Sequence, residues 1–221
     1  MSGAEPHRPA GTPPIVWAFA LTMCAVELAF VLADRNILPY PDLRFDTYLR
    51  LAFWDLYFEG MRGGEEVPGW FWGSFLTHAL VHGSIMHVAL NAVIFLALGR
   101  VLAIVLGPAR FVCLIAVTAV AGALTFGLIA DSRGPMVGAS GVVFGFFGAV
   151  KAWEWRWIRA TGAPANRFWG TIFGLTLMNV ILFFAFPGEG SLAWEAHLGG
   201  FVAGFLIAGI LAPNAAGPSP I

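Results

Sequence analysis

Long apolar segments alternate with shorter polar segments along the 221-residue chain. A helix that crosses a lipid bilayer needs about 20 mostly apolar residues. Six segments have roughly this length and composition, so the pattern predicts an all-α membrane protein, a six-helix transmembrane bundle. The expected spans are 15–33, 80–99, 110–130, 137–153, 168–187 and 193–211.

The composition of the chain agrees with this pattern. Hydrophobic residues make up 58% of the sequence and charged residues 11%, and a soluble fold has no interior large enough for so much apolar surface. The net charge of −1 and the absence of a basic cluster argue against a nucleic-acid partner. We expect a disordered N-terminal tail over 1–14, one transmembrane domain over 15–211, and a flexible C-terminal tail over 212–221.

Lysine and arginine in the short connections predict the direction of the spans. If the N-terminus lies inside, these connections place six basic residues inside and one, Arg133, outside. Cytoplasmic loops are enriched in basic residues, so both termini are predicted to face the cytoplasm. We expect a multi-pass protein of a bacterial cytoplasmic (inner) membrane. In this topology the second, fourth and sixth spans all start at the outer face.

Polar side chains of these three spans gather near their outer ends. A polar group within a span is unfavourable in lipid, and for that reason it is a functional candidate. The fourth span has about 17 residues, roughly 25 Å of helix against a hydrocarbon core of ~30 Å. Such a short helix would leave a depression open to outside water, which hydrolysis in a membrane needs. The polar residues are His82, His87, Asn91, Ser140 and His197.

Ser140 and His197 form a possible catalytic pair. A serine hydroxyl attacks a carbonyl carbon when a base takes its proton, and imidazole is the usual base. Small residues let membrane helices approach closely, and both spans carry glycines at helical spacing. The alternative is that the glycines serve packing alone and Ser140 bonds a backbone carbonyl; a histidine at matching depth weakens it. The glycines are Gly138, Gly141, Gly145 and Gly148 on the fourth span, and Gly200 and Gly204 on the sixth.

His87 and Asn91 are four residues apart and share one face of the second span. Together with the backbone N–H of Ser140 they would supply donors to a developing oxyanion. A metal site is the alternative, because His78 and His82 have the same spacing. It lacks cysteine and carboxylate ligands, and the step of five from His82 to His87 turns the helix face. The spacing therefore argues against a metal site.

No third member of a triad is predicted from the sequence. Glu195 lies two residues before His197, about 200° around the helix, and cannot orient that imidazole. Phe144, one turn after Ser140, is placed to stack against the imidazole. Glu27, in the first span, has no partner that the sequence identifies, and a structural hydrogen bond is favoured over catalysis.

Three motifs resemble those of the rhomboid family of intramembrane serine proteases. "GASG" at 138–141 is similar to the family's G-x-S-G, and "HGSIMHVALN" at 82–91 to its H-x4-H-x3-N. "AHLGGFVAG" at 196–204 is similar to its A-H-x-x-G-x-x-x-G. The motifs occur in the right order and on the right spans, and the resemblance covers roughly 70–211.

The resemblance implies a mechanism and a class of partner. It makes Ser140 the nucleophile and His197 the base, and it places His87 and Asn91 in the oxyanion hole, with no metal or organic cofactor. The partners would be transmembrane segments of single-pass membrane proteins, cut near their outer ends within the lipid bilayer.

Two other functions were weighed against proteolysis. A non-catalytic rhomboid-like protein that binds membrane clients would have lost its serine or histidine, and both are present. A transporter that relays protons or metal through histidines predicts an internal repeat, and the sequence has none. One departure from the family concerns the first loop, where many members carry a Trp-Arg pair. Here Trp72 is followed by Gly73 and Ser74, so the anchoring of this loop is an open question.

Overall fold

The computed structural model describes residues 11–130, 134–185 and 193–211. Most of the expected N-terminal tail and all of the C-terminal tail, 212–221, lie outside the described residues. The first helix begins at Pro14, with proline at a position where its missing N–H is not needed.

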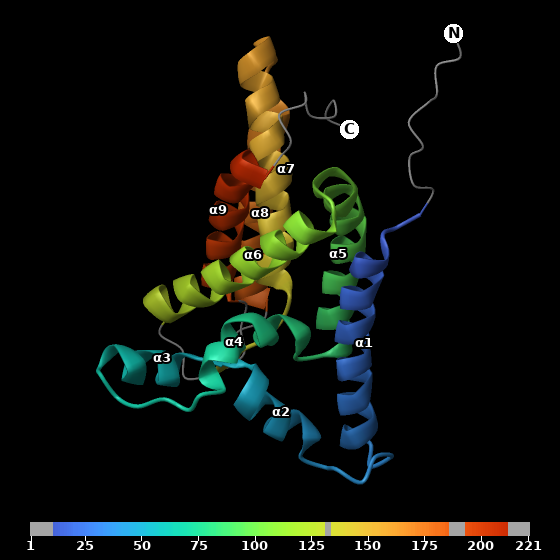
Figure 1. Cartoon of the computed structure of the whole chain (residues 1–221), viewed down its shortest axis with the longest axis vertical. Helices are drawn as coiled ribbons and strands as arrows, with labels where there is room; N and C mark the ends of the chain where they lie inside the picture. The colour runs from blue at the N-terminus through green and yellow to red at the C-terminus, as the bar shows by residue number, and fades with distance from the viewer. Residues whose placement is uncertain (1–10, 131–133, 186–192, 212–221) are drawn as a thin grey trace.

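The described chain is mostly helical, with one short strand pair in its loops (Figure 1). The helices are α1 (Pro14–Asp34), α2 (Leu43–Leu51), α3 (Asp55–Arg62), α4 (Phe71–Thr77), the 3-10 helix η1 (His78–Leu80), α5 (Ile85–Leu106), α6 (Pro108–Ile129), α7 (Ser140–Thr161), α8 (Asn166–Ala185) and α9 (Trp194–Leu211). The strands are β1 (Phe53–Trp54) and β2 (Pro135–Met136).

Five helices in the described chain are long and apolar enough to cross a membrane, namely α1, α5, α6, α8 and α9. They correspond to five of the six predicted spans, but α5 begins and ends later than the predicted 80–99. The fourth span differs, because α7 begins at Ser140 and ends at Thr161, later at both ends than the predicted 137–153. With 22 residues α7 is not a short helix. Its second half carries charged residues, and two of them, Lys151 and Glu154, form a buried ion pair.

The long helices form two groups (Figure 1). In one group α7, α8 and α9 stand together, and in the other α1 packs along α5, while α6 slants between them. Helix α9 packs against both α7 and α6. The short helices α2, α3 and α4 lie across one end of the molecule, where the chain leaves α1 and enters α5.

The two short strands anchor the first loop beside the start of α7. They pair antiparallel, with Phe53 opposite Met136 and Trp54 opposite Pro135. Because β2 lies shortly before Ser140, this pairing fixes the path of the chain into α7. The chain then passes through Gly138, whose φ of +113° is not helical, so the helix begins later than the apolar pattern predicts.

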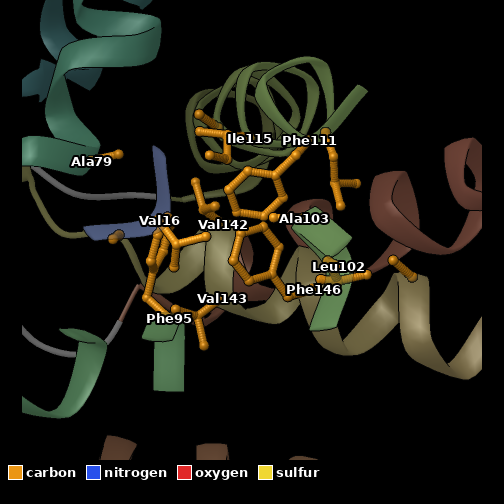
Figure 2. Packing of buried hydrophobic residues seen from close by; sticks show 14 of the residues in the cluster. Val16, Ala79, Phe95, Leu102, Ala103, Phe111, Ile115, Val142, Val143 and Phe146 are labelled. Carbon is orange, nitrogen blue, oxygen red and sulfur yellow. The ribbon is translucent and has the colours of Figure 1, made fainter. Parts of the chain in front are cut away.

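The main core joins α5, α6 and α7 through three fully buried rings (Figure 2). The centroid of the Phe146 ring lies 5.1 Å from that of Phe95 and 5.4 Å from that of Phe111. Tilted and edge-to-face ring pairs at such distances stabilise a core beyond the area they bury. A Cβ on Gly99 of α5 would touch Phe111, Phe146 and Val16 of α1, so this glycine lets four helices converge.

A second core lies under the first loop. The buried rings of Phe53, Phe58, Phe71 and Phe75 pack on one another, and Phe53 also contacts Phe126 of α6. The chain over 53–58 therefore buries its aromatic rings against α4 and α6.

Candidate active site

Ser140 and His197 meet at the N-terminal ends of two long helices. Ser140 is the first residue of α7, and His197 lies in the first turn of α9. The Ser140 Oγ and the His197 Nε2 are 2.7 Å apart, the distance of a hydrogen bond. His197 is buried. The fold thus brings together the two residues that the sequence singled out as a pair.

Glycine contacts between α7 and α9 make this meeting possible. A Cβ on Gly200 would overlap the carbonyl oxygen of Gly141, and a Cβ on Gly204 would overlap that of Gly145. The two backbones are therefore in direct contact at two successive turns. The contact begins one residue after Ser140 and about one turn after His197, so it fixes the separation of the helices where the two side chains meet.

Two other predicted glycines make different contacts. Gly138 precedes α7 and has a φ of +113°, a conformation that favours glycine. A Cβ there would lie 2.6 Å from the His87 Cε1. The Cα of Gly145 faces α6, and a Cβ added there would overlap the side chain of Thr118. The predicted glycine stripe therefore faces α5, α6 and α9 rather than one neighbour.

The imidazole of His197 is held on its face and at its second nitrogen. The Phe144 ring stacks on it, with centroids 4.2 Å apart and planes at 4°, which confirms the predicted stacking. The His197 Nδ1 lies 2.6 Å from the Oδ1 of Asn179 on α8. Asn179 was not predicted to be a site residue. The sequence feature that could have identified it is the presence of an amide side chain within the apolar segment 168–187.

His87 and Asn91 lie on α5, which packs against α7. Ser84 caps α5 and its Oγ accepts a hydrogen bond from the His87 N–H at 3.2 Å, which fixes the first turn. The His87 ring lies next to Gly138, two residues before Ser140. The buried Asn91 amide donates one hydrogen to the His87 carbonyl at 3.1 Å, and its second hydrogen is not used by this bond.

Two further histidines hold the turn that leads into α7. The Ala139 N–H donates to the His82 Nε2 at 3.3 Å, and the Gly138 N–H donates to the His78 carbonyl at 2.9 Å. Burial lowers the pKa of His78 to about 4, so its neutral ring donates from Nδ1 to the Ser74 carbonyl. Within the described ranges no three His, Cys, Asp or Glu side chains are grouped to hold a metal ion.

The partner of Glu27 is Arg44 on α2. The buried Glu27 carboxylate accepts two hydrogen bonds from the Arg44 guanidinium, at 3.1 and 3.2 Å. The same guanidinium binds Asp34 at 2.9 Å and donates to the His82 carbonyl at 3.1 Å. Arg44 therefore connects α1, α2 and the chain segment just before α5.

Tyr48 reinforces this connection. Burial raises the pKa of its phenol, which keeps its proton and donates it to the His82 carbonyl at 2.6 Å. The Trp72 side chain, at the position of the family's Trp-Arg pair, is exposed. The first loop is thus anchored by Arg44 and Tyr48 from α2.

The fold and the site define a multi-pass membrane protein with a hydrogen-bonded serine and histidine at the ends of closely packed helices. A model of the Rhomboid domain matches residues 69–214. The match covers more than half of the chain, which therefore belongs to the rhomboid family. Members of this family are in general serine proteases that act within membranes. The matched range contains Ser140, His197, His87 and Asn91.

Proposed function

We propose that this protein is an intramembrane serine endopeptidase. Its substrates are transmembrane segments of single-pass membrane proteins, cleaved near their outer ends. The observation that most strongly supports the proposal is the 2.7 Å separation of the Ser140 Oγ and the His197 Nε2 in a chain of the rhomboid family. The proposal includes cytoplasmic termini and a bacterial inner membrane, which put the starts of α7 and α9 at the outer face.

The reaction proceeds through an acyl-enzyme. The Ser140 Oγ attacks the carbonyl carbon of the scissile bond while the His197 Nε2 takes the hydroxyl proton. The resulting imidazolium gives this proton to the leaving nitrogen, the C–N bond breaks, and the acyl group remains as an ester on Ser140. A water molecule then attacks the ester, with His197 taking its proton and returning it to Ser140.

His87, Asn91 and the backbone N–H of Ser140 supply the oxyanion hole. Negative charge develops on the carbonyl oxygen in each addition step, and fixed donors stabilise it most effectively where water is scarce. The second amide hydrogen of Asn91 and the position of the His87 ring beside Gly138 support these roles.

The test combines probe labelling with peptide cleavage. Purified protein in detergent is treated with a fluorophosphonate probe and, separately, with a panel of tagged transmembrane peptides. The wild type is expected to be labelled at Ser140 and to cleave at least one peptide, and Ser140→Ala and His197→Ala are expected to do neither. Melting temperatures of all three proteins show whether the variants are folded.

Two outcomes contradict the proposal. Equal labelling of the wild type and His197→Ala would show that His197 is not the base. A wild type that is neither labelled nor active on any peptide would reject proteolysis.

A further inference from the structure

Helix α8 is held to the bundle by few packing contacts. Only 6% of the residues in its most apolar 18-residue stretch are buried, against 44% in the corresponding stretch of α6. Gly170 and Gly174 of α8 have nothing within 4 Å of a Cβ placed on them. The half of α8 near the start of α9 borders a cavity of about 260 Å³, which is lined by Thr176, Val180 and Trp194 among others. Apolar packing therefore does not fix this half of the helix.

Side-chain hydrogen bonds join α8 to both α7 and α9. The Lys151 Nζ of α7 donates to the Thr171 Oγ1 at 2.8 Å. The second contact joins Asn179 to His197 of α9, at 2.6 Å. Thr171 and Asn179 are separated by roughly 12 Å along a helix. The contact of Asn179 is the one that reaches the proposed active site.

The hydrogen bonds of the Asn179 amide determine which tautomer of His197 is present. The Asn179 Nδ2 donates to the Leu175 carbonyl at 2.9 Å, so the Oδ1 is the atom that faces the imidazole. An amide oxygen only accepts, and the His197 Nδ1 must therefore carry the ring proton. The lone pair is then on Nε2, which faces the Ser140 Oγ and is ready to take its proton.

The other tautomer would be unproductive. With the proton on Nε2, the imidazole would present a donor to the Ser140 Oγ and would have no lone pair there to accept the hydroxyl proton. Phe144 restrains the plane of the ring by stacking, but a stacked ring does not distinguish the two nitrogens. The choice of tautomer thus rests on the hydrogen bond to Asn179.

We propose that Asn179 is the positioning residue of the Ser140–His197 pair, and that the placement of α8 sets the tautomer and orientation of the base. This inference rests on the proposed function.

The test compares Asn179→Leu, which removes the acceptor, with Asn179→Asp, which keeps one. We expect Asn179→Leu to lower kcat about 10- to 100-fold with KM unchanged. A loss of this size is typical when a metal-binding histidine loses the hydrogen-bond partner that orients its ring. Asn179→Asp is expected to recover most of this loss. Thr176→Val is the matched control: Thr176 lines the same cavity and bonds the Ile172 carbonyl, and its kcat is expected to stay within about twofold of the wild type.

Nitrogen NMR of histidine-labelled protein in micelles measures the tautomer directly. The His197 resonances, assigned with His197→Ala, are expected to show Nδ1 protonated in the wild type and mixed tautomers in Asn179→Leu. Three results would each overturn the inference. The first is a wild-type kcat in Asn179→Leu, and the second is an equal loss of kcat in Asn179→Leu and Asn179→Asp. The third is a His197 ring that stays protonated at Nδ1 in Asn179→Leu. A wild type without activity would reject the proposed function instead, and the nitrogen shifts would still decide whether Asn179 sets the tautomer.

Discussion

Helices α9 and α8 each contribute one side chain to the hydrogen-bonded series Ser140–His197–Asn179, but they are attached to the bundle in different ways. Helix α9 lies in backbone contact with α7 through Gly200 and Gly204. Helix α8 is mostly exposed. Phe168 in its first turn packs against Trp155 of α7, and farther along polar side chains attach it at Thr171 and Asn179. Lipid gives helices no hydrophobic reason to associate, so close packing and hydrogen bonds are the two means available.

The two kinds of attachment have different consequences. Direct backbone contact is rigid, because no side chain can rotate to relieve a displacement. Hydrogen bonds between membrane helices contribute on average only about 0.6 kcal/mol, so an attachment through them is easily broken and remade. The nucleophile and base are therefore on the rigid pair of helices, and the residue that orients the base is on the loosely attached one.

The largest effect is expected for Gly200→Ala. Its Cβ would overlap the Gly141 carbonyl oxygen, which moves only if α7 or α9 moves. Overpacking of this kind destabilises by about 1–3 kcal/mol, and a 1 Å displacement of reacting groups lowers a rate ~10²-fold. We expect kcat to fall about 100-fold and the melting temperature to fall with it. Wild-type kcat and melting temperature would show that the two backbones are not in contact.

A smaller effect on activity is expected for Arg44→Ala, which tests the anchoring of the first loop. The change leaves the buried Glu27 carboxylate without its guanidinium partner, and loss of one partner from a buried pair destabilises by about 3–5 kcal/mol. The melting temperature should fall clearly. Activity should fall less than in Gly200→Ala, because Tyr48 still binds the His82 carbonyl.

A double variant tests the pairing itself. Adding Glu27→Gln to Arg44→Ala removes the unpaired charge and is expected to restore part of the lost stability. Additive losses in the double variant would show that Glu27 and Arg44 do not stabilise the protein as a pair.

A smaller effect again is expected for Thr171→Val, at the other polar attachment of α8. The Lys151 Nζ keeps its bond to Glu154, so the charge stays paired. We expect kcat to change by about two- to threefold, in line with the loss of one membrane hydrogen bond. The same change combined with Asn179→Leu should be less than additive in kcat. Full additivity would mean that the two attachments act independently.

The smallest effect, and one of opposite sign, is expected for Gly174→Ala. A Cβ at this position of α8 meets nothing within 4 Å, and alanine is favoured over glycine in a helix by about 0.5–1 kcal/mol. The variant should keep wild-type kcat and melt at the same or a slightly higher temperature. A loss comparable to that of Gly200→Ala would remove the contrast between α8 and α9.

Much of the architecture follows from local properties of the sequence. Five of the predicted spans correspond to helices that meet the length and hydropathy of a membrane crossing, because apolar length is a property of a single segment. The stacking of Phe144 on His197 was predicted from the spacing of one helical turn. The glycines at 141, 145, 200 and 204 indicated that their helices approach a neighbour closely, since small residues at helical spacing can be recognised in the sequence before the neighbouring helix is known.

The positions that the sequence left open depend on how elements are placed relative to one another. The start of α7 was predicted three residues too early, because Gly138 has a φ of +113° and its N–H donates to the His78 carbonyl, 60 residues earlier in the sequence. The contact of Asn179 with His197 requires the rotation of α8 about its own axis, and that of Glu27 with Arg44 requires the path of the first loop. The sequence by itself determined which residues are polar, small or apolar and which segments are long enough to cross a membrane. Only the tertiary structure decided which of them meet, because a hydrogen bond forms within about 3 Å and hydropathy places a side chain no more finely than one turn of helix.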